Sequence, residues 1–300
     1  MGNDGFSERK KGFEGLKGVF YLEGNDLERF QNELLGIALD VITVLDESDI
    51  FYTLSGGSLL GAVRHNGFVP WDDDIDINIP RKDLEKLKEV FPKRLGDKYD
   101  LCCPEYGDGH GLSIVQIKKK DTVYRSYNEL GKTVAGIGID LFVLENVPNN
   151  IVVRGIHGVL CLAVGYCLSA RYVFSLRKYL EPYMKQKDEV RQMFSMKIFL
   201  GFLLSFLSID KWTKLVKTVY SLCKNDESKY VAIPSGRKHY FGEMYLRKDV
   251  CKYREGFFCG RQIKIPYGAE AYLKRLYGNG YMEIPRYEER EKHPVFELRY

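Results

Sequence analysis

The sequence predicts an α+β fold, in which helices cover a sheet and an apolar helical subdomain is added to it. Two observations lead to this prediction. Between 26 and 144, helical segments alternate with several short strand-like runs, which is the pattern of a sheet covered by helices. Between 151 and 209 the chain becomes strongly apolar over helical lengths. With 300 residues and 45% hydrophobic composition, the chain can form one large domain or two modest ones with a true core.

The elements are predicted in chain order. An amphipathic helix covers 26–49, with Asp26 as its N-cap, because apolar residues recur there at helical spacing. A short strand over 51–54 leads through a turn into a short helix over 59–64. The later predicted elements are a strand over 70–80, a helix over 82–95, strands over 112–118, 123–127, 137–144 and 257–266, and a helix over 269–277.

Changes in composition divide the chain into four predicted segments. Residues 1–25 are Gly-rich and charged, lack the apolar core of a signal peptide, and are predicted to be a mobile tail. Residues 26–150 hold the sheet and its functional residues. Residues 151–228 form the apolar helical subdomain, and residues 229–300 pack back on the core.

Charge and cysteine content exclude several classes of protein. The net charge of +4 is mild and most basic residues are dispersed, so no nucleic acid polymer is predicted as a partner. Seven cysteines, none at zinc-ligand or redox-motif spacing, predict reduced thiols in a cytoplasmic protein.

Three aspartates carry the strongest functional signal. In the strand predicted over 70–80, Asp72, Asp74 and Asp76 share one face, because side chains alternate along a strand. Such neighbours lie roughly 6.6 Å apart, and at an effective dielectric of about 20 each pair of carboxylates repels by roughly 2.5 kcal/mol. A divalent cation would offset this repulsion, and hard oxygen ligands favour Mg²⁺ or Mn²⁺. A calcium loop of the EF-hand type is excluded, because the sixth position from Asp72 is not glycine.

Two further features fit phosphate chemistry at this cation. Ser55, Gly56, Gly57 and Ser58 lie between a strand and a helix start, where glycine lets the backbone approach a ligand and the helix end favours an anion. Asp140 is a lone acid in an apolar strand. It is predicted to be a third functional carboxylate, with a salt bridge to an Arg or Lys as the alternative.

Arg64 closes the short helix that follows the glycine turn. Two roles are open for it. Its guanidinium has the geometry to bind a phosphate with two hydrogen bonds. It also has the charge to complement the helix dipole at the C-terminal end.

The apolar region has two interpretations. The runs 151–176 and 194–209 are interrupted by Lys and Arg, and each uninterrupted run falls short of the roughly 20 residues of a spanning helix. They form either a buried helical subdomain or helices that lie in a membrane surface with their basic residues at its edge.

The run LSGGSLLGAVRHNGFVPWDDDID at 54–76 resembles the signature of the LicD family, which includes bacterial phosphocholine transferases and is related to the fukutin-type ribitol-phosphate transferases. The run GIDLF at 138–142 resembles the family's second acidic strand, and LYGNGYMEIP at 276–285, followed by Arg290 and His293, resembles its C-terminal motif. Gln116 departs from the pattern, because a lysine is usual there.

This resemblance implies a nucleotidyltransferase-like core with a mixed sheet. It implies that Asp74 and Asp76 bind the divalent metal, Mg²⁺ or Mn²⁺, with Asp72 beside them. Asp140 would hold a second metal or accept a proton from the acceptor hydroxyl. Lys118 joins Ser55, Gly56, Gly57, Ser58 and Arg64 in the set predicted to bind the donor.

The resemblance also implies a metal-dependent phosphotransferase. It would move a phospho-alcohol such as phosphocholine from a CDP-linked donor, for example CDP-choline, to a hydroxyl of a cell-surface glycan or its lipid-linked precursor, releasing CMP. Two alternatives are a nucleotidyltransferase that releases pyrophosphate and a non-catalytic, membrane-associated scaffold that binds glycans. The predicted location is the cytoplasm, peripheral to the inner face of the membrane.

Overall fold

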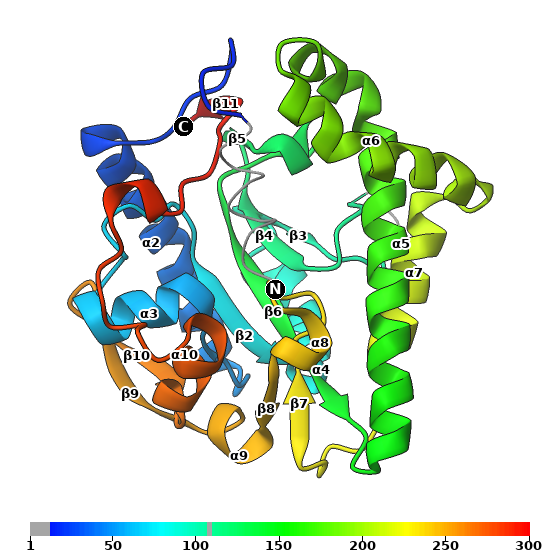
Figure 1. Cartoon of the computed structure of the whole chain (residues 1–300). Coiled ribbons are helices and arrows are strands. Elements are labelled where there is room, and N and C mark those ends of the chain that lie inside the picture. Colours follow the sequence, from blue (N-terminus) through cyan, green and yellow to red (C-terminus); the bar gives the residue numbers. More distant parts are fainter. Residues whose placement is uncertain (1–12, 107–109) are drawn as a thin grey trace.

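The computed structural model describes residues 13–106 and 110–300 of the chain (Figure 1). The centre of this described part is a seven-stranded sheet, in which β2 and β6 run parallel and the other neighbouring strands run antiparallel. The predicted α+β fold with a mixed sheet is therefore confirmed. The main strand order is β1 (Thr53–Leu54), β2 (Asp76–Pro80), β6 (Gly138–Val147), β4 (Val115–Lys119) and β3 (Tyr99–Cys102); β7 (Tyr230–Ala232) pairs with β6, and β8 (Met244–Leu246) pairs with β7.

Helices and two small two-stranded sheets complete the fold. Ile77 and Ile79 of β2, and Ile75 just before it, are buried and pack in the main hydrophobic cluster, to which α2 and α10 also contribute. Figure 1 shows α3 beside α10, so the C-terminal segment returns to the N-terminal half. The elements are α2 (Gly24–Glu47), α3 (Gly56–His65), α4 (Arg81–Arg94), α8 (His239–Gly242), α9 (Arg247–Val250), α10 (Ala269–Tyr277), the pair β9 (Tyr253–Phe258) and β10 (Arg261–Pro266), and the pair β5 (Val123–Arg125) and β11 (Glu297–Arg299).

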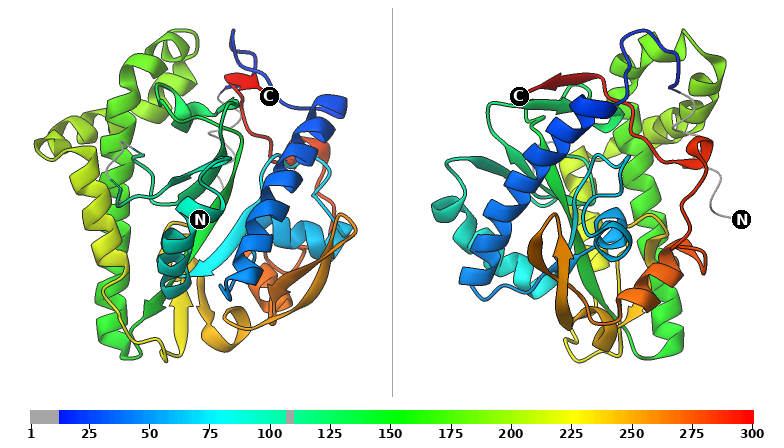
Figure 2. Two further views of the ribbon diagram at one scale, coloured as in Figure 1. Left: turned by 180° about the vertical axis from the view of Figure 1, so that it is seen from behind. Right: turned by 90° about the vertical axis from the view of Figure 1, so that its left-hand side faces the viewer.

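The apolar middle of the chain forms three helices that stand across the sheet from α2 and α3 (Figure 2). They are α5 (Ile151–Met184), α6 (Asp188–Leu203) and α7 (Ile209–Tyr220). The Asn150 side chain caps α5 by accepting hydrogen bonds from the backbone N–H groups of Val152 and Val153. These helices have hydrophobic clusters of their own, separate from the main core.

The order of the predicted elements agrees with the structure, and several boundaries differ. The first helix begins at Gly24 with Glu23 at its N-cap, so the predicted cap Asp26 lies in the first turn. The strand predicted over 70–80 begins only at Asp76, and the preceding acidic run is a loop. The strand predicted over 257–266 is not continuous: it contains the end of β9, a hairpin turn at Cys259 and Gly260 with positive φ at both residues, and β10.

The segment predicted to be a mobile tail, 1–25, is only partly described, because residues 1–12 lie outside the described residues. Phe13 and Leu16 are buried against Tyr127, Tyr183 and other side chains of the second hydrophobic cluster. The part of this segment from Phe13 onward is therefore packed, since burial of these two apolar side chains stabilises it.

Among the described helices, α5 is long and apolar enough to cross a membrane. The α6–α7 region would pass the same test as one broken span, with a bend of 92°. Of the apolar window of α5 that meets this criterion of length and composition, 22% is buried inside the protein.

Candidate active site

A cavity of about 1970 Å³ lies between the sheet and the helical subdomain. The start of α3, the acidic loop, β4 and β6 line one side of it, and α5 and α6 line the other. The loop before α8 and the segment at Glu291–Pro294 complete the walls. Sequence-distant elements therefore meet around one space, which is the usual form of a ligand site.

The predicted aspartates converge in this cavity. Asp76 and Asp140 are direct neighbours in the register of the parallel strands β2 and β6. Asp72 and Asp74 reach the same space from the loop that precedes β2, and all four line the cavity. The sequence placed Asp72 and Asp74 on the strand; the structure brings them together with Asp76 from a loop instead.

The charges in this group oppose one another. Burial raises the pKa of Asp76 well above its ordinary value, and the neighbouring carboxylates of Asp74, Asp140 and Asp72 raise it further. Burial also raises the pKa of Asp140 to about 6, although a 2.8 Å hydrogen bond from the Gln116 side-chain amide opposes this shift. Repulsion of this kind is relieved when a cation binds among the carboxylates.

Two glycines make room for the carboxylates. A Cβ atom on Gly56 would lie 2.3 Å from Oδ2 of Asp76, and Gly56 also has a φ of +46°. A Cβ atom on Gly57 would lie 2.4 Å from Oδ2 of Asp72. The glycine turn therefore does more than connect a strand to a helix, because any side chain here would displace the acidic group.

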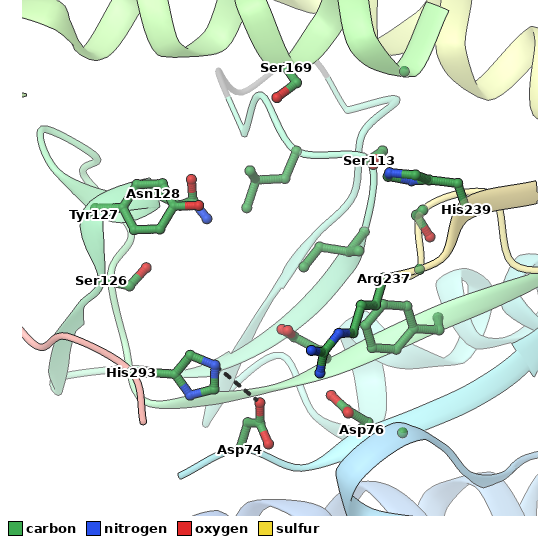
Figure 3. Close-up of a pocket in the computed structure, with 18 of the residues that line it drawn as sticks. Asp74, Asp76, Ser113, Ser126, Tyr127, Asn128, Ser169, Arg237, His239 and His293 are labelled. Atoms are coloured by element: carbon green, nitrogen blue, oxygen red, sulfur yellow. Dashed lines mark ion pairs between the residues drawn. The ribbon is translucent and has the colours of Figure 1, made fainter. Parts of the chain in front are cut away.

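His293 joins the acidic cluster from the C-terminal segment (Figure 3). Its Nδ1 atom is hydrogen-bonded to Asp73, and its Nε2 atom lies 4.0 Å from Oδ2 of Asp74. Asp72, Asp74 and His293 can each offer one ligand atom to a metal ion, and these three atoms lie within 4.8 Å of one another. The sequence showed this histidine only as part of the C-terminal motif, and nothing in its local pattern predicts contact with a residue 220 positions away.

These donors suit a hard divalent cation. Carboxylate oxygens are the ligands that Mg²⁺ and Mn²⁺ prefer, and an imidazole nitrogen is tolerated by Mn²⁺. The raised pKa of Asp76 and the glycine cradle that holds Asp72 and Asp76 close together both fit a site built for a positive charge. The residues present are therefore compatible with the predicted metal.

The remaining predicted residues divide into two groups. Ser55, Gly56, Gly57 and Lys118 line the cavity. Ser55 is buried and shares a 2.8 Å hydrogen bond with the Tyr272 hydroxyl. Lys118 is buried too, with its Nζ atom 2.6 Å from Oε1 of Glu129.

Ser58 and Arg64 differ from the prediction, because neither lines the cavity. The Ser58 hydroxyl accepts a 2.9 Å hydrogen bond from the backbone N–H of Asp76, so it positions the start of β2. Arg64 donates to the backbone carbonyls of Tyr281 and Glu283, both at 2.9 Å. Its guanidinium therefore holds the C-terminal segment in place.

A loop that the sequence did not single out faces the carboxylates. Arg237 and Lys238 precede α8, His239 is its first residue, and all three line the cavity. Glu243, just after α8, is buried there, and burial raises its pKa to about 7. Figure 3 shows the Arg237 side chain directed toward the region of Asp74 and Asp76.

Comparison with known proteins agrees with this geometry. Residues 49–151, which contain the acidic loop, β2 and β6, match the family described as LicD/FKTN/FKRP, nucleotidyltransferase domain. Over 266 residues the chain is 24% identical to the lipopolysaccharide cholinephosphotransferase LicD of Haemophilus influenzae, covering 83% of this chain and 88% of that protein. Over 60 residues it is 38% identical to the ribitol 5-phosphate transferases FKRP of Homo sapiens and Mus musculus, which covers 20% of this chain and 12% of those proteins. The predicted resemblance to the LicD family is thereby confirmed, and residues 49–151 are the part of the chain that matches the family's nucleotidyltransferase domain.

Proposed function

We propose that this protein transfers a phospho-alcohol, phosphocholine or a similar group, from a CDP-linked donor to a hydroxyl of a cell-surface glycan or its lipid-linked precursor. The observation that carries the proposal is the convergence of Asp72, Asp74, Asp76 and Asp140 in one cavity of the matched domain. The names of the relatives support it, since one is a cholinephosphotransferase and others are ribitol 5-phosphate transferases.

The proposed reaction breaks a phosphoanhydride bond of the donor and forms a phosphoester bond to the acceptor. The acceptor oxygen forms a bond to the phosphorus that carries the alcohol. The bond from that phosphorus to the oxygen it shares with CMP breaks, and CMP leaves with this oxygen. The proton of the acceptor hydroxyl is released, so atoms and charge balance.

We assign the carboxylates of Asp72, Asp74, Asp76 and Asp140 to a divalent metal site, with Mg²⁺ or Mn²⁺ as the ion. The register pairing of Asp76 with Asp140 favours both as ligands. When bound, such an ion neutralises charge on the donor phosphates. The first turn of α3 lines the cavity beside these carboxylates. The backbone N–H of Gly56 donates to the Tyr272 hydroxyl at 3.4 Å, and that of Gly57 donates to the Asp76 carboxylate, so this turn holds the acidic group in place.

Identification of the released nucleotide tests the proposed function. The protein is incubated with Mg²⁺, a glycan acceptor extract and a panel of CDP-alcohols, and products are followed by ³¹P NMR. Release of CMP together with a new phosphodiester is expected. Pyrophosphate formed from a nucleoside triphosphate would favour the nucleotidyltransferase instead, and no turnover of any donor would favour the non-catalytic scaffold.

We further propose that the protein lies at a membrane surface through its helical subdomain. This subdomain exposes many large apolar side chains that do not line the cavity: Ile151, Val152, Val153, Ile156 and Val159 on α5, and Phe199, Phe202, Leu203 and Phe206 at the end of α6 and just after it. No Asp or Glu occurs from 151 to 180 or from 190 to 208, whereas Arg and Lys do. An apolar surface free of negative charge suits anionic lipid.

The inner side of α5 argues for a helix that lies on the membrane and does not cross it. Ser169 and Tyr172 line the same cavity as the carboxylates. His157 is buried, with Nε2 2.8 Å from the carbonyl oxygen of Val219 and Nδ1 3.2 Å from the Tyr240 hydroxyl. These contacts tie α5 to the rest of the domain, so its apolar outer face remains for the lipid. A lipid-linked acceptor would then approach the cavity from this side.

A further inference from the structure

We infer that Arg237 binds the diphosphate of the nucleotide donor, and that Glu291 occupies the Arg237 guanidinium until the donor arrives. This inference rests on the proposed function, because it assigns the donor's phosphates to a residue of the same cavity. Its ligand class is a nucleoside diphosphate. No residue of the loop 233–243 lies in the region matched to the family domain.

The loop that carries Arg237 is held in one shape by Glu243. The backbone N–H of Lys238 donates a 2.7 Å hydrogen bond to Oε1 of Glu243, and the backbone N–H of Ile233 donates to the Glu243 carbonyl oxygen at 3.0 Å. Gly236 leaves no room for a side chain, because a Cβ atom there would lie 2.4 Å from Oε1 of Glu243. The loop is therefore closed around the buried carboxylate.

A second set of contacts fixes this loop to α10. Arg275 donates from Nε to the carbonyl oxygen of Gly242 at 3.0 Å and from a terminal nitrogen to that of Phe241 at 2.7 Å. Lys238 donates in the opposite direction, to the carbonyl oxygen of Arg275 at 3.0 Å. Lys238 is thus turned toward α10, and Arg237 is the long cation of the loop that the close-up shows directed toward the acidic cluster (Figure 3).

The present partner of Arg237 is a carboxylate that a phosphate can replace. Its Nη1 atom lies 2.7 Å from Oε2 of Glu291, and both side chains are about one third exposed at 32%. Glu291 lies two residues before His293, which contacts the acidic cluster. An exposed pair of this kind is weak, whereas a guanidinium binds a phosphate with two charged hydrogen bonds. Exchange of Glu291 for the donor is therefore favourable.

Two other lysines that line the cavity, Lys118 and Lys197, have different surroundings. Lys118 is buried against Glu129 on the sheet side. Lys197 donates to the Ser169 hydroxyl at 2.7 Å, within the helical subdomain. Arg237 combines a planar fork, partial exposure and a rigid loop facing the carboxylates, which together favour it as the diphosphate ligand.

Calorimetric titration of the full chain with CDP and Mg²⁺, in the absence of acceptor, tests the inference. Arg237→Gln is expected to weaken CDP binding by about tenfold or more, because charged hydrogen bonds are lost. Arg237→Lys is expected to recover only part of this loss, since an ammonium cannot form the paired contact. Glu291→Gln is expected to tighten CDP binding severalfold, because the competing charge is gone.

Two controls separate a direct contact from a structural role. Arg254→Gln, on β9, removes an exposed ion pair with Glu270 of α10 and is expected to leave CDP affinity unchanged. Cytidine, which lacks phosphate, is expected to bind the wild type and Arg237→Gln equally. Wild-type CDP affinity in Arg237→Gln, or no CDP binding by the wild type, would overturn the inference. Normal CDP binding without turnover of any CDP-alcohol would instead overturn the proposed function and leave the role of Arg237 standing.

Discussion

Asp76 and Asp140 face each other across the parallel strand pair β2–β6, in direct register. Each is held by a different part of the chain: the backbone of Asp76 donates to the Ser58 hydroxyl, and the carboxylate of Asp140 accepts from Gln116. Neither carboxylate is paired with an Arg or Lys among the described ion pairs, which makes the salt-bridge alternative for Asp140 a poor fit. Two neighbouring acids without a basic partner lower the stability of the fold. Their presence at one position of the sheet therefore indicates a ligand-binding site.

Asp76→Asn is expected to separate function from stability. Turnover should fall by about two orders of magnitude or more, as when one preorganised charge-stabilising group is removed. The melting temperature measured in EDTA should rise, because the neutral amide ends repulsion from Asp74 and Asp140. Scanning fluorimetry and the CMP-release assay measure the two effects. Asp97→Asn, at an exposed position, should change neither, and near-normal turnover of Asp76→Asn would remove Asp76 from the site.

The glycine cradle makes a second prediction. Gly57→Ala places a methyl group against Asp72, so activity should fall by about tenfold or more while the fold is retained, since a misplaced reacting group is costly. Gly36→Ala in α2 is the matched control, because a Cβ atom there meets nothing within 4 Å. It should raise the free energy of unfolding by about 0.5–1 kcal/mol without affecting activity. Equal activity in both variants would show that the cradle has no role in turnover.

Elements with a strong local pattern were predicted with accurate bounds. Elements and residue roles that depend on tertiary contacts were predicted less well. The helix 269–277 was predicted with the bounds that α10 has, because its apolar residues recur cleanly. The hairpin β9–β10 was predicted as one strand, since its turn at Cys259 and Gly260 lacks the common Asn-Gly or Asp-Gly signal. A phosphate role for Arg64 is open in the sequence because its actual hydrogen-bond partners cannot be read locally. These partners, the backbone carbonyls of Tyr281 and Glu283, lie more than 200 positions away.

The convergence of the acidic residues and of Lys118 on one cavity could be predicted from the sequence, whereas the positions of Arg237 and His293 in it could not. Asp72, Asp74, Asp76 and Asp140 stand out because charges within apolar runs are costly unless they have a function. His293 and Arg237 look ordinary in their own segments, and only the return of the C-terminal half to the sheet brings them to the cavity. Such contacts form only when distant parts of the chain pack together, and the periodicity of the sequence does not predict that packing.

Glu243 makes stability depend on pH. Its pKa rises from 4.5 to about 7 on folding, because burial disfavours the charged carboxylate. An acid whose pKa is raised by folding stabilises the native state fully below about pH 4.5, and this contribution is lost as pH rises through about 7. Relative to Glu243→Gln, the wild type should therefore lose on the order of 3 kcal/mol of unfolding free energy across this window. Urea unfolding at several pH values measures the difference.

The exposed Glu288→Gln variant is the control for this titration, and its curve should parallel the wild type. Parallel curves for wild type and Glu243→Gln would contradict a raised pKa at Glu243.

Arg64→Gln tests whether this residue is a brace for the C-terminal segment. Loss of the charged hydrogen bonds to the carbonyls of Tyr281 and Glu283 should lower the free energy of unfolding by about 1–3 kcal/mol. Limited proteolysis should cut faster within 278–290. CDP affinity in calorimetry should stay within about threefold of the wild type, because the guanidinium does not line the cavity. A large loss of CDP affinity at unchanged stability would return Arg64 to its predicted role at the phosphate.

The apolar outer surface of the helical subdomain makes the last prediction. Phe199 and Phe206 are 62% and 72% exposed in a stretch without acidic residues. The double variant Phe199→Asp, Phe206→Asp should lose binding to vesicles of anionic phospholipid in co-sedimentation, because it removes apolar area and adds negative charge where lipid would pack. Phe257→Asp is the matched control: this phenylalanine is 60% exposed, but on β9 in the pair with β10, away from the helical subdomain. If all three proteins sediment equally with vesicles, or if the wild type does not sediment, the membrane role of this surface is wrong. The expected result is that only the double variant loses vesicle binding, while it still releases CMP with a water-soluble acceptor. This result would place the lipid contact at α6 and the turn after it, and would separate that contact from the chemistry at Asp74 and Asp76.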